Sequence, residues 1–421
     1  MTWPSHDPQW LKTSLEVGDH RVPERRLCWA ALAFTVVFAA AMTPFRRSNQ
    51  HPEIASTIVY VSNPTGHGIR FIASIVSALN DRAVVTWCDG RLDKGLGGAK
   101  NDFPSIAPRS LARHIGFRHL KLAVYDFGRA TPTRDLTMDY SPLYWRYLLF
   151  AQRVRYALAT ERLSNAGVKM LLSDMDRNSG CAPVVMAAKD LGIPTAALVH
   201  GAPSRHYLPI LSSHVLAWST LQRDWFRASG VSCDIHIVGR PDISFALEDS
   251  AGTRIVVAHS REILTDNELR RLQSLLTQAG KLGIARCLRL HPQTQSLASE
   301  GIWTELSFDA VEFADGGLDW LRDCKLLLTV SSTTAIDALS YGVPCIVVAD
   351  ASRELPCELE YLRIVSDRSE SNHDLTLPLD SYLAAARSAI LPFVGADASM
   401  CLSNVIDQIA HSSTTVEESR G

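Results

Sequence analysis

From residue 57 onward the chain alternates short apolar runs with amphipathic segments of helix length. In the first half, apolar runs of strand length lie at residues 57–61, 83–87, 169–172, 195–199, 215–219 and 235–238. Helical patterns stand between several of them, at residues 69–79, 182–191 and 221–228. Strands that alternate with helices of this length are typical of βαβ units. The pattern therefore predicts an α/β fold with parallel sheets.

The alternation is interrupted once and then begins again. Residues 242–253 are polar and are interpreted as an inter-domain linker. Further strands are predicted at residues 254–258, 287–290, 311–313, 325–330 and 345–348. Thr265 and Glu268 have the spacing of a capping box, which predicts a helix to about Ala279.

These patterns predict two Rossmann-like domains that face a central cleft. The first domain covers residues 51–241 and the second covers residues 254–379. Helices are expected over 380–410, and the polar tail, 411–421, is expected to be disordered. Residues 140–156 are rich in aromatic side chains and are predicted to form a helix.

Two polar clusters follow strands of the second domain. Four hydroxyl residues come directly after the apolar run 325–330: Ser331, Ser332, Thr333 and Thr334. Capping the helix that follows requires fewer hydroxyls, and a helix N-terminus stabilises an anion. Arg289, His291 and Pro292 stand at the end of the run 287–290. Because ligands of open α/β sheets bind outside the carboxyl ends of the strands, we expect both clusters to hold one phosphate group.

Other candidates stand after predicted strands as well. His67 lies in a loop between Gly66 and Gly68. The two glycines allow the backbone of this loop to approach a ligand closely, and His67 is a candidate general base. The further candidates are His200 and Asp89 for catalysis, and Gly201, His259 and Ser260 for contact with the phosphate-bearing ligand. Each histidine has a simpler interpretation, as a loop residue or as a side chain that only bonds its own turn.

One short motif allows a different chemistry. Asp174 and Asp176 form an Asp-x-Asp motif after a strand, which in GT-A enzymes holds a divalent metal and the nucleotide. That fold would leave the second Rossmann-like domain unexplained. We therefore expect no bound metal, and Asp174 is expected to line the cleft.

Composition excludes several classes of protein. The 421 residues are 46% hydrophobic and carry a formal net charge of −2, with no basic stripe suited to nucleic acid. The nine cysteines form no Cys-x-x-Cys motif and no cluster with histidine. This argues against a disulfide framework and a structural zinc, and it favours a reducing compartment.

The N-terminal segment, residues 1–50, contains an uncharged run from 27 to 45 between two pairs of arginines. As a helix this run would be roughly 28 Å long, close to the thickness of a bilayer core. A membrane helix, a core helix and an untranslated extension upstream of Met42 remain open. The expected location is the cytoplasm or the cytoplasmic face of the membrane.

Residues 165–350 resemble the GT-B glycosyltransferases. The resemblance is nearest to the bacterial enzymes of surface polysaccharides, namely capsule and Kdo transferases, sialyltransferases and CDP-glycerol glycerophosphotransferases. It implies that residues 51–241 bind the acceptor and residues 254–379 the nucleotide donor. It also implies that His291 contacts the donor phosphate, with Pro292 fixing the turn, and that Ser331, Ser332 and Thr333 bind phosphate. His200 and Gly201 would face the cleft. It further implies a glycosyltransferase of cell-surface polysaccharide or glycolipid assembly. Such an enzyme takes a nucleotide-activated sugar as its substrate, needs no cofactor, and has a glycan or lipid-linked acceptor.

The chain also departs from the related families. The paired carboxylates of the sialyltransferase motif are reduced to Asp89, in Cys88-Asp89-Gly90. The second domain lacks the two carboxylates eight residues apart of retaining enzymes, which favours inversion, and Asp337 is the acidic residue of that helix. A CDP-glycerol-type glycerophosphotransferase, a sugar-nucleotide 2-epimerase and a non-catalytic GT-B scaffold remain alternatives. The donor base, the sugar, the acceptor and the linkage are left open.

Overall fold

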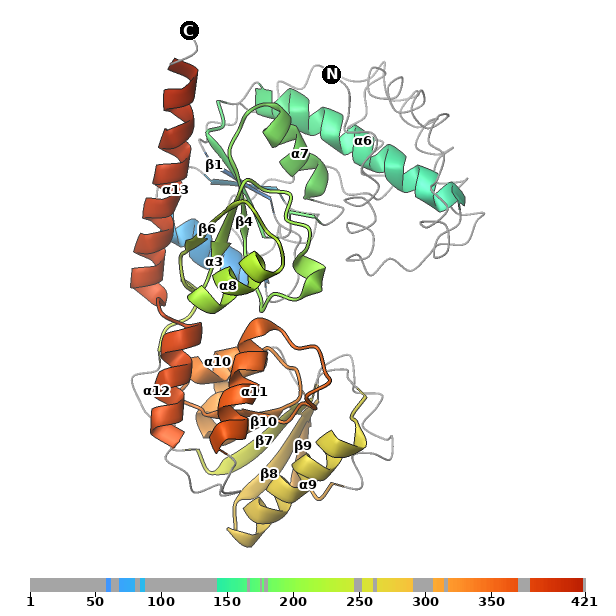
Figure 1. Cartoon of the computed structure of the whole chain (residues 1–421), viewed down its shortest axis with the longest axis vertical. Helices are drawn as coiled ribbons and strands as arrows, with labels where there is room; N and C mark the ends of the chain where they lie inside the picture. Colours follow the sequence, from blue (N-terminus) through green and yellow to red (C-terminus); the bar gives the residue numbers. More distant parts are fainter. Residues whose placement is uncertain are drawn as a thin grey trace.

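The protein folds into two parallel-sheet domains, seen one above the other in Figure 1. The computed structural model describes residues 58–61, 68–79, 84–87, 142–164, 167–174, 176–177, 181–245, 252–259, 263–290, 306–313, 317–369 and 379–418. The predicted N-terminal helix of residues 27–45 lies outside these ranges. Within them, no helix combines the length and the apolar character needed to cross a membrane.

The first domain is built on six strands, all parallel, in the order β2-β1-β3-β4-β5-β6. The strands are β1 (Ile58–Val61), β2 (Val84–Trp87), β3 (Met170–Ser173), β4 (Thr195–Leu198), β5 (His214–Ala217) and β6 (Asp234–Ile237). The helices are α3 (Gly68–Ala78), α6 (Pro142–Ser164), α7 (Ala182–Asp190), α8 (Thr220–Ala228) and the 3-10 turn η3 (Arg205–Tyr207). The predicted strands are confirmed. The inner strands β1, β3 and β4 are buried at every position, as their apolar runs indicate, whereas β6 at the edge is exposed or half-buried.

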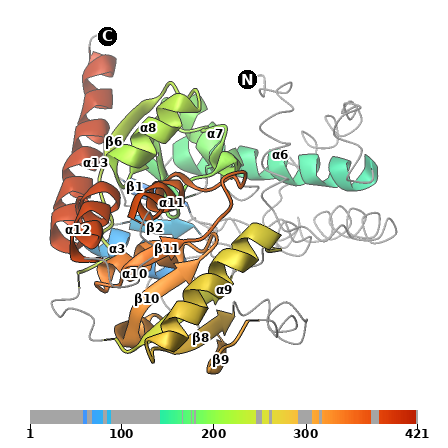
Figure 2. The same ribbon diagram turned by 60° about the horizontal axis from the view of Figure 1, so that its bottom comes forward.

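The second domain has five parallel strands in the order β11-β10-β7-β8-β9. They are β7 (Arg254–His259), β8 (Ala285–Leu290), β9 (Ala310–Phe313), β10 (Cys324–Thr329) and β11 (Cys345–Val347). The helices in this half of the chain are α9 (Asp266–Lys281), η6 (Asp319–Asp323), α10 (Thr334–Ser340), α11 (Cys357–Ser369), α12 (Leu379–Ile390) and α13 (Gly395–Glu418). Figure 2 shows α9 running along β8.

Local signals account for the helix ends. Thr265 and Glu268 form the predicted capping box of α9, which satisfies N–H groups at its first turn. After α10, Gly342 has a φ of 75°, a left-handed conformation that glycine adopts at little cost. The α/β fold with two parallel-sheet domains is therefore the one expected from the sequence.

The C-terminal helices do not form a unit of their own. α12 lies beside the second domain, whereas α13 returns along the first (Figure 1). Leu402 and Ile406 of α13 share a buried cluster with Phe71 and Ile75 of α3. The helix continues to Glu418, although the sequence predicts a disordered tail from residue 411. Once α13 is nucleated and packed, each added residue extends it at small cost.

The chain crosses between the domains twice, near residue 240 and near residue 394, and these two segments contact each other. Arg240 donates its N–H to the carbonyl of Phe393 (3.0 Å), and Gly395 donates to the carbonyl of Arg240 (3.2 Å). Gly239 has a φ of 75°, and a Cβ there would lie 2.3 Å from the Phe393 oxygen. The position therefore requires glycine. Ile243 is buried, so the predicted linker begins as a packed segment.

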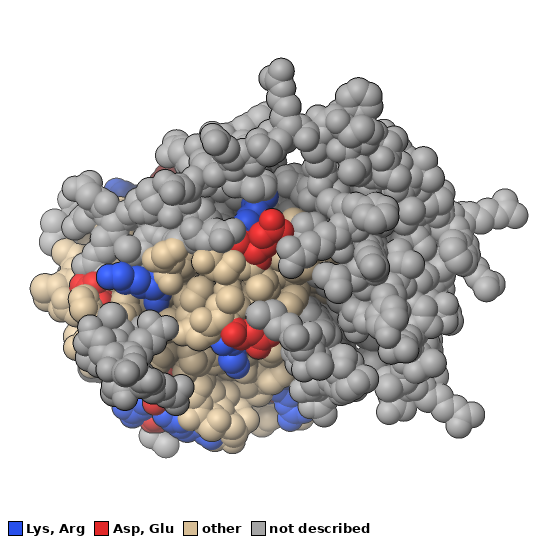
Figure 3. Space-filling model, turned by 90° about the horizontal axis from the view of Figure 1, so that it is seen from above, with Lys and Arg blue, Asp and Glu red and all other residues tan. Residues whose placement is uncertain are grey.

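The surface has mixed charge on the face shown in Figure 3. Acidic and basic side chains of the described surface are interspersed there, and neither sign gathers into a patch.

Candidate functional site

Strand register brings the predicted donor residues of the second domain to one edge. Ala258 of β7 is level with Arg289 of β8 and with Thr329 of β10. The residues that follow these three positions therefore meet at the carboxyl edge of the sheet. β7 has β10 on one side and β8 on the other, so this is also a switch point, where ligands of such sheets bind.

The hydroxyl turn holds its shape with only part of its hydroxyls. Thr329 donates from its hydroxyl to the Ala258 carbonyl (2.9 Å) and accepts the N–H of Ser332 (3.0 Å). The Ser332 hydroxyl accepts the N–H of Thr334 (3.3 Å) and donates to its hydroxyl (3.0 Å). Toward the rest of the described chain, the hydroxyls of Ser331 and Thr333 make no hydrogen bond. The turn's own hydrogen bonds thus use the hydroxyls of Ser332 and Thr334, and they do not use those of Ser331 and Thr333.

Arg289 has a structural role that the sequence did not indicate. Its Nη1 lies 3.2 Å from the Glu312 carboxylate of β9, and its guanidinium stacks 4.7 Å from the Trp320 ring centroid. Arg289 is predicted to contact the donor, and in the structure these two contacts tie its side chain to β9 and η6. His259 ends β7 and is buried. His291, Pro292 and Ser260 lie outside the described residues.

In the first domain, His200 follows β4 with a fixed orientation. Its Nδ1 lies 2.8 Å from the backbone carbonyl of Asp174. A carbonyl can only accept, so Nδ1 carries the proton and Nε2 carries the lone pair of the neutral ring. The Tyr207 hydroxyl lies 3.5 Å from the same Nδ1, and a Cβ at Gly201 would lie 3.1 Å from that hydroxyl. The geometry suits His200 to act as a base through Nε2.

The other candidates of the first domain follow β1 and β2. Gly66, His67 and Asp89 lie outside the described residues. Gly68 is the first residue of α3.

The Asp-x-Asp motif stabilises a connection. The Asp176 carboxylate accepts the N–H groups of Leu211 and Ser212, each at 2.8 Å. Burial raises its pKa, although these bonds and the neighbouring Arg177 oppose the shift. Arg177 stacks 4.7 Å from the Tyr207 ring centroid. The motif therefore fixes the β4–β5 connection, and no cluster of three potential metal-ligating side chains occurs in the described ranges.

Arg240 joins the two domains and was missed in the sequence. It follows β6 and bonds both Asp242 oxygens at 2.6 Å. Its Nη2 lies 3.9 Å from Asp337, in the first turn of α10, and its guanidinium stacks 4.2 Å from the Trp218 ring centroid. Burial lowers the pKa of Arg240. The carboxylates of Asp242 and Asp337 together raise it by more than burial lowers it, so the net shift is upward. The carboxyl edge of the first sheet thus contacts the helix that follows the hydroxyl turn.

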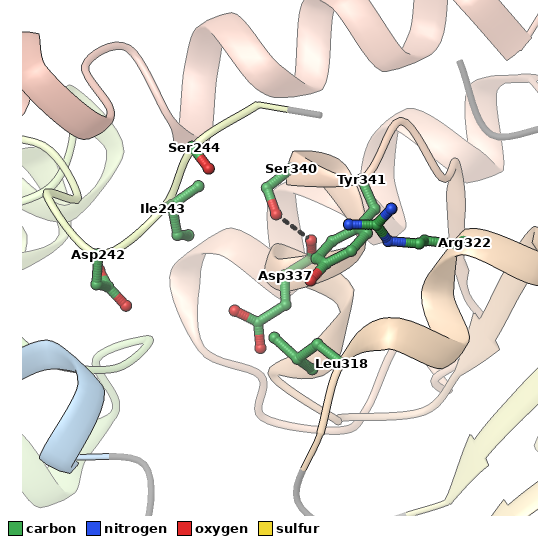
Figure 4. Close-up of a pocket in the computed structure, with 8 residues that line it drawn as sticks. All are labelled: Asp242, Ile243, Ser244, Leu318, Arg322, Asp337, Ser340 and Tyr341. Carbon is green, nitrogen blue, oxygen red and sulfur yellow. Dashed lines mark hydrogen bonds between the residues drawn. The ribbon is translucent and has the colours of Figure 1, made fainter. Parts of the chain in front are cut away.

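A pocket of about 150 Å³ lies beside this contact (Figure 4). Asp242, Ile243 and Ser244 line it from the inter-domain connection, and Asp337, Ser340 and Tyr341 from the second domain. Figure 4 shows the Asp337 carboxylate directed toward the side of Asp242. A sequence signal did exist for Arg240, because Gly239-Arg240-Pro241 follows a predicted strand as His291-Pro292 does.

Residues 291–352 match a family model described as "Putative glycosyltransferase (DUF6716)". No curated protein matches the chain. Solved structures similar to it include the UDP complex of MnaA from S. aureus, with 12% identity, 85% of this chain and 96% of that chain covered, and a TM-score of 0.49. The calicheamicin glycosyltransferase CalG4 has 11% identity over 84% of this chain and 98% of that chain, with a TM-score of 0.48. A UDP-GlcNAc 2-epimerase from Neisseria meningitidis has 13% identity over 84% of this chain and 99% of that chain, with a TM-score of 0.46.

Proposed function

We propose that this protein is a GT-B-type glycosyltransferase that moves a sugar from a nucleotide donor to a hydroxyl acceptor. The observation that carries the proposal is the family match over residues 291–352. That segment contains β10, the hydroxyl turn, α10 and β11. It is the part of the chain where strand register and hydroxyl geometry independently favour a phosphate site.

On the donor side, the hydroxyls of Ser331 and Thr333, with His291, bind the phosphates of the nucleotide. Charge develops on these phosphates as the bond to the sugar breaks, and hydrogen-bond donors held in place stabilise it. The proposed reaction therefore proceeds without a bound metal.

On the acceptor side, His200 is the proposed general base, and His67 is the other candidate. The acceptor hydroxyl attacks the anomeric carbon while Nε2 of the histidine takes its proton. The bond from the anomeric carbon to the phosphate oxygen breaks, and the nucleotide leaves with the electron pair. A single displacement of this kind inverts the anomeric centre. The finer proposal is an enzyme of cell-surface polysaccharide or glycolipid assembly that acts at the cytoplasmic face of the membrane.

The test is an incubation with UDP-, GDP-, CMP- and dTDP-sugars and with CDP-glycerol, with and without glycan or lipid-linked acceptors. Release of nucleotide that depends on both a nucleotide sugar and an acceptor is expected. Interconversion of the sugar without an acceptor would indicate an epimerase. Acceptor-dependent release of nucleotide from CDP-glycerol, and from none of the nucleotide sugars, would indicate a glycerophosphotransferase. Absence of nucleotide binding across the panel would indicate a scaffold.

The base is tested with His200→Ala, which is expected to lower kcat by roughly 10²- to 10⁴-fold. The matched control is His214→Gln. His214 is the first residue of β5, at the opposite edge of the same sheet, where it pairs with His236 at 3.3 Å. Equal loss in both variants would contradict the role of His200.

A further inference from the structure

A buried hydrogen bond joins a helix of the first domain to a helix of the second. Gln222 of α8 donates from Nε2 to Oε1 of Glu358 in α11, at 2.5 Å. Both residues have no exposed surface. α8 also packs against α11 and α12. A polar contact this deep in an interface is unlike a surface ion pair, since water does not screen it.

Gln222 is held in place by its own domain. Its Oε1 accepts the N–H of Trp218 (2.8 Å), and its own N–H reaches the Ser219 hydroxyl (3.4 Å). Its Nε2 also lies 3.5 Å from the carbonyl of Gly201. The side chain therefore connects Glu358 to the turn that carries His200.

We propose that Gln222 and Glu358 form a latch between the two domains, in which Glu358 is a positioning residue for the His200–Gly201 turn. The role in positioning rests on the proposed function, whereas the latch itself does not. When the latch is closed, the proposed base stands at a fixed place relative to the donor domain. When it is open, the domains are free to separate and exchange ligands.

The charge on Glu358 controls this latch. Burial raises the pKa of Glu358 to about 7, against the opposing effects of Cys357, Gln222 and Arg240. Cys357 lies on the same helix, with its Sγ 3.1 Å from Oε2. The charge of Arg240 has the smallest of these effects. Tyr207 also interacts electrostatically with Glu358, and burial raises the pKa of Tyr207 further from neutrality.

The sign of the pH effect follows from the raised pKa. The closed form holds the proton more tightly than a solvated glutamate does, so closure is favoured at low pH. This preference is lost as the pH rises from the ordinary value of 4.5 through about 7. Between pH 5 and pH 8 the closing equilibrium is expected to fall by on the order of tenfold to a hundredfold.

Amide hydrogen exchange on the free, full-length protein at pH 5 and pH 8, corrected for intrinsic rates, tests the latch. In the wild type, the protection of residues 199–208 and of α11 is expected to fall together between pH 5 and pH 8, by on the order of tenfold to a hundredfold. Glu358→Gln, which is neutral and still accepts from Gln222, should keep its protection at pH 8. Gln222→Met, which removes the donor, should lower protection at both pH values.

The control is Glu354→Gln, which removes an exposed ion pair between the domains. Arg205 and Glu354 lie 2.9 Å apart with side chains 82% and 62% exposed, so this variant should behave as the wild type. A loss of protection in α11 without a loss in 199–208 would overturn the latch, as would equal protection at both pH values. Since no substrate is present, failure of the latch leaves the proposed transfer untouched. A latch that is confirmed in a protein without transferase activity would instead refute the proposed function.

Discussion

The ion pair of Arg240 offers the sharpest test of how the domains are held together. Arg240→Met removes the guanidinium and keeps an apolar side chain beside Trp218. Arg240 and Asp242 have side chains 8% and 6% exposed, so the change leaves the Asp242 carboxylate buried without its two bonds. Asp337, 3.9 Å from the guanidinium, loses its share of the same charge.

The expected cost comes from two contributions. Removing one partner of a buried ion pair costs about 3–5 kcal/mol. The stacked contact with Trp218 adds roughly 0.5–2 kcal/mol when it is shielded from water. Part of the latter survives because methionine still packs on the ring. We therefore expect Arg240→Met to lower the free energy of unfolding by about 4 kcal/mol.

Urea denaturation followed by far-UV circular dichroism and by tryptophan fluorescence measures this loss. The double variant Arg240→Met/Asp242→Leu should recover part of the stability, because it no longer buries the unpaired Asp242 charge. Arg223→Ala is the matched control, since Arg223 pairs with Asp224 at 42% and 67% exposure and should cost less than about 1 kcal/mol. A loss for Arg240→Met no larger than that of the control would refute the reasoning.

Three further predictions concern the Asp-x-Asp motif, metal dependence and the N-terminal segment. Asp176→Ala removes the acceptor of two backbone N–H groups and should lower the free energy of unfolding by about 3 kcal/mol, measured in urea; unchanged stability would contradict its structural role. Transfer activity should persist in excess EDTA, whereas its loss with rescue by Mn²⁺ or Mg²⁺ would assign the motif to a metal. If residues 27–45 attach the protein to membranes, full-length protein should sediment with them and a chain starting at Arg46 should not; equal partitioning of the two would remove that idea.

The sequence predicted the sheets well for a physical reason. A strand such as β4 is buried at every position, so its apolar run has the length of the strand itself. α9 was predicted by its capping box, which is a local interaction. The helix α11 was missed because its first turn mixes Cys357, Glu358 and Glu360 and shows no apolar stripe.

The site was predicted less completely, because its contacts join distant parts of the chain. Arg289 follows the same rule as His291, yet Glu312 and Trp320 take up its guanidinium, and neither neighbour is visible in the local pattern. Asp176 has the appearance of a metal ligand until the β4–β5 connection folds over it. The pairing of Gln222 with Glu358 depends on how the two domains pack, which periodicity does not encode.

The central claim is that the hydroxyl turn binds the phosphates of a nucleotide. Isothermal titration calorimetry with UDP, GDP, CMP, CDP and dTDP, on the wild type and on Ser331→Ala/Thr333→Ala, tests it directly. This pair avoids Ser332, whose hydroxyl serves the turn itself. Thr277→Ala is the control, because this exposed hydroxyl on α9 donates to the carbonyl of Gln273 within its own helix. At least one nucleotide should bind the wild type, and the double variant should bind it more weakly by about 1–3 kcal/mol for each lost contact, with the control unchanged. Equal affinity in the wild type and the double variant would contradict the claim.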